Sequence, residues 1–244
     1  MSEILHLSTT AFAVVFAAVL VGAIIQGAIG FGLNLVVVPV VAILEPAALP
    51  ASMIVMAVPM TLGSALRERG HIDRSGIGWT TLGRLPGVAL GAWIVDRLDP
   101  DALASVIGAL VVIAAGMSVL SPPIRLRPGS ACLAGLASGV MGTASSIGGP
   151  PIALLYQHQP GPVLRSTLGA IFAIGVAMSL GALLLAGQVA RWQALLGVAL
   201  MPAIGLGLWL SRFLHAWLDR GWLRPCLLIF AVCSGMTVLL RGLL

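Results

Sequence analysis

The stretch Gly27-Ala28-Ile29-Gly30-Phe31-Gly32, followed by Pro39, has a counterpart in Gly139-Val140-Met141-Gly142, followed by Pro151. In both copies the pattern is G-x-x-G with a proline nine residues after the second glycine, inside a long apolar segment. Glycine and proline interrupt helices, and a bilayer offers no water to the backbone groups that an interruption frees. In membrane proteins such interruptions typically line a cavity that holds a small solute near the bilayer midplane. The repeated pattern therefore predicts a transporter.

The composition supports a membrane protein and argues against other broad classes. Hydrophobic residues make up 59% of the 244-residue chain, charged residues make up 9%, and the mean hydropathy is +1.08. Soluble domains carry about 25% charged residues. The net charge of +5 comes from dispersed arginines, so we expect no nucleic-acid partner. The first apolar run exceeds a signal peptide's core of about 7–15 residues, and the three cysteines form no C-x-x-C pair. We expect no cleavage, no metal and no cofactor.

The apolar segments predict an all-α polytopic membrane protein with about eight transmembrane segments. A spanning helix needs about 20 apolar residues. The first segment is too long for one straight crossing and Gly148-Gly149-Pro150-Pro151 interrupts the fifth, so we expect both to be broken helices. The predicted limits are 9–44, 47–66, 76–96, 101–120, 130–157, 162–187, 190–212 and 221–242.

The two halves of the chain are predicted to be repeats. Proline, glycine and tryptophan occur at equal intervals in 86–93 and 202–209, and the sequence GMSVL at 116–120 returns as GMTVL at 235–239. We therefore predict repeats at 1–120 and 130–244, each with four membrane segments, joined by a linker at 121–129. Four crossings per repeat would give both repeats the same orientation, unless a glycine-rich segment re-enters on the side from which it came.

Arginine placement gives a weak prediction of orientation. With eight crossings and a cytoplasmic N-terminus, seven arginines fall in inner loops and five in outer loops. Cytoplasmic loops of membrane proteins carry the excess of positive charge, and the first half of the chain follows this rule more clearly than the second. The pattern therefore favours a cytoplasmic N-terminus.

Arg84 is the charged residue that the pattern places deepest in a membrane segment. It lies about eight residues, or roughly 12 Å, inside the third segment, where burial of a cation costs about 2.5–3.5 kcal/mol. One interpretation is a cationic anchor for an anionic solute. The other, with equal weight, is a side chain that extends to the cytoplasmic headgroups.

Uncharged polar residues occupy matching positions around the two glycine motifs. Gln26 and Asn34 lie four residues either side of Gly30, as Ser138 and Ser146 do around Gly142. Such pairs fit a solute site shared between the repeats, although small and hydroxyl residues also serve simply as helix packing contacts. The predicted substrate-binding residues are Gln26, Gly30, Phe31, Gly32, Asn34, Arg84, Gly142, Thr143, Ser145, Ser146, Gly149 and Pro150.

Two other kinds of function are alternatives to transport. An intramembrane enzyme would need a nucleophile or metal constellation, and the four histidines are scattered with no H-E-x-x-H or G-x-S-x-G motif. A non-transporting membrane partner or assembly protein would need surface outside the bilayer, and the connecting loops are short. We therefore expect the partners to be a small anion and the lipid bilayer, with the oligomeric state open.

The sequence also resembles a known family. The stretches AIGFGLNLVVVP at 28–39, GVMGTASSIGGPP at 139–151 and LPGVALGAW at 85–93 resemble the sulfite exporter TauE/SafE family of membrane permeases. The resemblance extends over nearly the whole chain. It implies a bacterial inner-membrane permease for sulfite, a sulfonate or a related small sulfur or organic anion. Leu33 and Asn34 stand where further glycines are frequent in the family, so the resemblance leaves the particular anion open.

Overall fold

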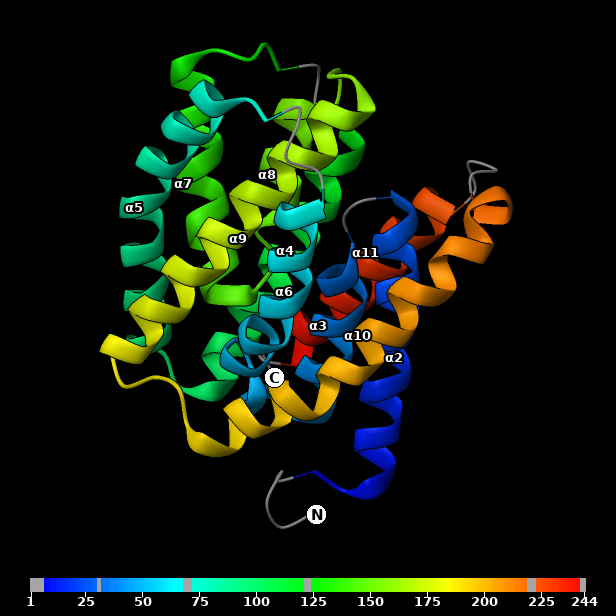
Figure 1. Ribbon diagram of the computed structural model, residues 1–244. Helices are drawn as coiled ribbons and strands as arrows, with labels where there is room; N and C mark the ends of the chain where they lie inside the picture. The colour runs from blue at the N-terminus through cyan, green and yellow to red at the C-terminus, as the bar shows by residue number, and fades with distance from the viewer. Residues whose placement is uncertain (1–6, 30–31, 68–71, 121–123, 219–222, 242–244) are drawn as a thin grey trace.

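The computed structural model describes residues 7–29, 32–67, 72–120, 124–218 and 223–241. Within these residues the fold consists of ten α-helices and one short 3-10 helix, and no strand is present, so the all-helical class is confirmed (Figure 1). The α-helices are α2 (Thr9–Ile29), α3 (Leu33–Leu44), α4 (Ala51–Arg67), α5 (Arg74–Arg97), α6 (Pro100–Leu120), α7 (Pro128–Ser145), α8 (Gly149–Tyr156), α9 (Gly161–Leu185), α10 (Arg191–Leu218) and α11 (Leu223–Arg241).

The outer surface of the bundle is suited to lipid. Within the described residues, three apolar stretches, in α2, α9 and α10, are long enough to cross a membrane, and shorter apolar stretches occur in α3, α4, α6 and α11. Large apolar side chains point outward along the length of α5, among them Trp79, Leu85 and Trp93, each more than 40% exposed. A run of exposed side chains of this kind is stable against acyl chains and not against water.

Two of the predicted segments are each divided into a pair of helices. The first gives α2 and α3, and the second gives α7 and α8. The backbone conformation changes sharply at both divisions. Gly32 precedes α3 with a φ of 120°, and Ser146 ends α7 with a φ of 62°, in the left-handed region. Glycine adopts positive φ readily, whereas a serine there is sterically unfavourable and needs support from its surroundings.

The α7–α8 pair leaves and returns to the same end of the molecule. At the upper end in Figure 1, the Tyr156 hydroxyl at the end of α8 donates to the Asp73 carboxylate, 3.0 Å away, at the start of α5. At the opposite end, Gln188 after α9 donates to Asp96 near the end of α5 over 2.8 Å. Since α6 carries the chain from the lower end back to the upper end, α7 begins where α8 ends (Figure 1). The pair is a helical hairpin.

The α2–α3 pair forms the matching hairpin at the lower end. A Cβ placed on Gly22 of α2 would lie 2.9 Å from the side chain of Leu33, so α3 runs back alongside α2. Just after α3, the carbonyl of Ala47 accepts a hydrogen bond of 2.6 Å from Gln193, at the start of α10. This contact lies at the lower end, where α2 also begins (Figure 1).

The prediction of eight crossings in parallel repeats is not confirmed. Three helices follow the hairpin in each half, namely α4, α5 and α6 in the first and α9, α10 and α11 in the second. Three is an odd number, so the second half starts from the opposite end and runs in the opposite sense (Figure 1). The sequence left this alternative open because hydropathy detects apolar length but does not tell a crossing from a return. The prediction of loop sides from eight crossings, and with it the count of seven arginines against five, does not apply.

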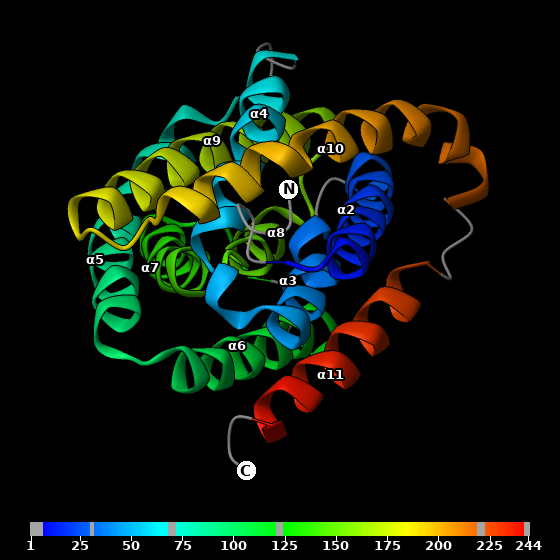
Figure 2. The same ribbon diagram turned by 90° about the horizontal axis from the view of Figure 1, so that it is seen from below.

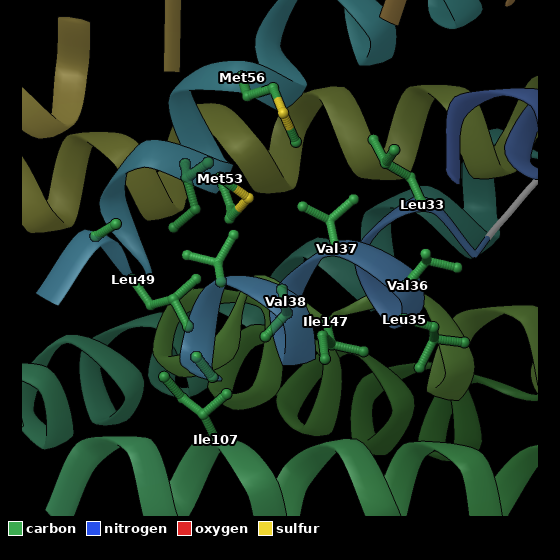
Figure 3. Packing of buried hydrophobic residues seen from close by; sticks show 14 of the residues in the cluster. Leu33, Leu35, Val36, Val37, Val38, Leu49, Met53, Met56, Ile107 and Ile147 are labelled. Atoms are coloured by element: carbon green, nitrogen blue, oxygen red, sulfur yellow. The ribbon is translucent and has the colours of Figure 1, made fainter. Parts of the chain in front are cut away.

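Each helix packs against a partner in the other half, and the pairings stay the same when the two halves are exchanged. Helix α5 packs along α7 while α10 packs along α2, and α4 pairs with α9 as α6 pairs with α11 (Figure 2). The short helices α3 and α8 lie in the middle, with the longer helices around them (Figure 2). Buried residues of α3, including Val37 and Val38, form the main apolar core with Met53 of α4, Ile107 of α6 and Ile147 (Figure 3). The core therefore holds the hairpin turns in place from several sides.

Candidate functional site

The two hairpin turns meet at one cavity of about 80 Å³. A water molecule needs roughly 10–15 Å³ by the same measure, so the cavity has room for a solute of several heavy atoms. It is lined by α2, α3, α4 and α5 of the first half and by α7, α8 and α9 of the second half. Eight of the twelve predicted residues line it: Gln26, Gly32, Asn34, Arg84, Gly142, Ser146, Gly149 and Pro150.

Arg84 is the charged group of this cavity. It lies ten residues into α5, about 15 Å from the start of the helix, and is only 4% exposed. The Nε and Nη1 atoms are buried and make no hydrogen bond, and no acidic side chain in the described part of the chain forms an ion pair with Arg84. The side chain thus turns inward, in contrast to the headgroup interpretation. A buried guanidinium with free N–H donors can bind an anion.

Two glycines provide the space that this guanidinium occupies. A Cβ on Gly175 of α9 would fall on the guanidinium itself, and a Cβ on Gly142 of α7 would lie 3.0 Å from Nη2. The charged group of α5 is therefore held between α7 and α9 and directed at the cavity. The glycine pattern predicts Gly142 as a point of helix interruption, but in the structure its lack of a side chain leaves room for a cation.

Asn34 connects the two hairpin turns directly. Its Nδ2 atom donates to the backbone carbonyl of Ser146 over 2.6 Å, and its Oδ1 atom is buried with no partner. Asn34 and Ser146, which occupy matching positions after the two glycine motifs, thus meet through the backbone of Ser146. The Ser146 hydroxyl donates instead to the carbonyl of Pro50 over 3.0 Å, which supports the left-handed conformation of this residue.

The other polar residues near the turns hold the hairpins together. Gln26 accepts a hydrogen bond of 3.0 Å from the backbone N–H of Leu33, across the interruption between α2 and α3. Ser138 donates to the carbonyl of Gly148 over 2.6 Å, across the turn between α7 and α8. Both side chains therefore satisfy backbone groups that the interruptions free, as burial in an apolar medium requires.

Two of the predicted residues that the structure describes, Thr143 and Ser145, do not line the cavity. Thr143 shares a hydrogen bond of 2.8 Å with Ser179, and Ser145 donates to the carbonyl of Met141 over 2.7 Å, so both act in helix packing. Gly30 and Phe31 lie outside the described residues. The cavity also includes residues that the sequence did not indicate, among them Thr61, Gly148, Phe172, Val176 and Ser179.

The all-helical fold with an outward-facing apolar surface defines a polytopic membrane protein. The chain belongs to the sulfite exporter TauE/SafE family, whose profile matches residues 14–238. This is a family of integral membrane permeases and not of enzymes, and membership indicates a membrane transporter of small sulfur anions. No match was found among curated proteins or among solved structures.

Proposed function

We propose that this protein is a bacterial inner-membrane permease that moves sulfite, a sulfonate or a related small anion through the cavity between the two hairpin turns. The observation that carries the proposal is Arg84, a buried cation with two unpaired donor atoms at the cavity. Burying an arginine in a membrane costs about 2.5–3.5 kcal/mol, and an anion in the cavity offsets that cost. The charge of Arg84 in turn offsets the cost of removing the anion from water.

The hairpin turns add a second source of attraction for an anion. Helices α3 and α8 both begin beside the cavity, with Gly32, Leu33 and Gly149 at its wall. The N-terminus of a helix carries about half a positive charge, and two such ends meet here. Together with Arg84 they favour a small anion over a neutral or cationic solute.

We also propose that the two halves form an inverted repeat whose copies differ at one position that matters for function. Reciprocal helix neighbours and opposite directions of the halves support two repeats at 1–120 and 130–244. The shared proline, glycine and tryptophan spacing aligns Arg84 with Leu200, which is fully buried. Only the first repeat therefore supplies a cation at this position, so the halves contribute different chemistry to one site.

The experiment is anion transport by purified protein in vesicles, with sulfite and simple sulfonates as solutes. We expect Arg84→Ala to lower transport at least tenfold, which corresponds to about 1.4 kcal/mol of lost binding. Arg84→Lys keeps a charge but loses the planar fork of donors, so we expect partial activity. The matched control is Arg97→Ala, because Arg97 is exposed at the end of α5 and pairs only loosely with Asp96, at 3.9 Å.

Two outcomes would contradict the proposal. Unchanged transport by a folded Arg84→Ala protein would remove the cavity as the binding site. No transport of any tested anion by the wild-type protein, with no thermal stabilisation by them, would favour the alternative of a non-transporting membrane partner or assembly protein.

A further inference from the structure

We propose that the cavity selects an anion that carries one negative charge and retains a hydrogen-bond donor, such as hydrogensulfite or an amino- or hydroxy-sulfonate. This inference rests on the proposed function and refines its substrate class. It comes from the pairing of two groups at the cavity, the Arg84 guanidinium and the Asn34 amide.

The charge of the solute follows from the charge of the cavity. Among the described residues that line it, Arg84 carries the one formal charge, and the others are apolar or uncharged polar groups. A single buried cation balances one negative charge. A second negative charge on the solute would remain unpaired in a medium where unpaired charge is costly.

The orientation of the Asn34 amide is fixed by its partner. A backbone carbonyl can only accept a hydrogen bond, so the atom 2.6 Å from the Ser146 oxygen must be the Nδ2 donor. The other end of the amide is then an acceptor, Oδ1, and this oxygen is buried without a partner. The assignment of nitrogen and oxygen in this side chain is therefore not arbitrary.

An unpaired acceptor beside an anion site discriminates between solutes. Oxygen atoms of a fully deprotonated anion would face the Asn34 oxygen lone pair to lone pair, which is repulsive. A solute O–H or N–H satisfies that oxygen and leaves the remaining solute oxygens for the Arg84 donors. A site built to bond a solute hydroxyl or amine strongly rejects the analogue that lacks it.

The test uses sulfamate and methanesulfonate, which have the same charge and nearly the same shape but differ by an amino in place of a methyl group. We expect purified wild-type protein to bind sulfamate at least tenfold more tightly. In Asn34→Leu, which removes the acceptor and keeps a side chain of similar size, we expect the ratio to fall close to one. Methanesulfonate binding should change less than sulfamate binding.

A second measurement needs no variant and so does not depend on whether Asn34→Leu folds. The affinity of the wild-type protein for total sulfite should fall as pH rises through the ionisation of hydrogensulfite. The affinity for methanesulfonate, which does not titrate there, should stay constant over the same range and reports any change in the protein itself.

The outcomes separate this inference from the proposed function. Equal affinity for sulfamate and methanesulfonate, with both dependent on Arg84, would overturn the donor requirement and leave the anion site standing. A sulfite affinity that rises with pH would overturn it as well, since the dianion would then be the preferred form. Failure of all these anions to bind would overturn both proposals.

Discussion

At the scale of single residues, the position of Arg84 depends on two neighbouring glycines that have no side chain. The guanidinium lies against Gly175 and Gly142, on two helices that do not carry it. An arginine at this depth was evident in the sequence, because a charge inside an apolar segment is conspicuous. Gly175 was not, since a glycine in an apolar helix carries no polar signal. Its importance lies in the contact with Arg84, which only the three-dimensional arrangement reveals.

We expect Gly175→Ala to weaken anion binding at least tenfold, because the added methyl group would displace the guanidinium from the cavity wall. The control is Gly181→Ala in the same helix, where a Cβ meets no atom within 4 Å. Binding of sulfite to both purified variants would be measured by thermal shift, with their unliganded melting temperatures as the check on folding. Equal affinities would show that Arg84 can bind from a displaced position.

At the scale of the helices, the hairpins were the feature that the sequence could not provide. The helical segments follow from apolar length, and both interruptions follow from glycine and proline. The return of the chain in a hairpin does not follow from the sequence. The segment 9–44 has enough apolar residues either for one tilted crossing or for the two helices of a hairpin. Helix α3 is about 18 Å long and α8 about 12 Å, both shorter than the roughly 30 Å of a bilayer core. We therefore expect both turns to lie at membrane depth.

Helices α5 and α7 approach each other unusually closely, and the glycines on both make this possible. A Cβ on Gly87 would meet the carbonyl oxygen of Leu136, and a Cβ on Gly135 would meet the carbonyl of Thr80. In a membrane, close backbone approach of this kind is a main source of helix association. The α5–α7 contact thereby fixes the helix that carries Arg84 against the hairpin whose turn lines the cavity.

We expect Gly87→Ala to destabilise the protein by about 1–3 kcal/mol, the usual cost of overpacking a tight contact. Gly78→Ala, on the same helix with open space around it, should leave stability unchanged or raise it slightly, because alanine favours helices. The measurement is unfolding of the purified variants in one detergent. Equal stability of the two variants would mean that α5 and α7 can separate at little cost.

At the scale of the whole molecule, the directions of the helices change the membrane orientation that the distribution of arginines predicts. The connections and helix ends at the lower end in Figure 1 carry Arg97, Arg191 and Arg241. Among the residues that the structure describes, the upper end carries seven arginines: Arg67, Arg74, Arg125, Arg127, Arg165, Arg212 and Arg224. Positive charge accumulates on the cytoplasmic side, so we expect the upper end to face the cytoplasm, and the start of α2 and the end of α11 to face outward. This reverses the orientation that eight crossings had favoured.

Cysteine labelling in intact cells tests this orientation. In a protein whose three native cysteines are replaced by serine, Ala186→Cys lies between α9 and α10 at the lower end, and Leu126→Cys lies between α6 and α7 at the upper end. We expect a membrane-impermeant maleimide to label Ala186→Cys in intact cells and Leu126→Cys only after the membrane is opened. The reverse pattern would place the N-terminus in the cytoplasm.

The buried arginine also has an electrical consequence. A guanidinium stays protonated at any physiological pH, so Arg84 cannot discharge a proton to accompany a departing anion. If the proposed site releases a monoanion to the other side alone, each turnover moves one elementary charge through the membrane. A potential of 100 mV then contributes about 2.3 kcal/mol, roughly a fiftyfold concentration ratio. Because bacterial cells are negative inside, the resting voltage by itself would drive such an anion outward, with no second ion and no nucleotide.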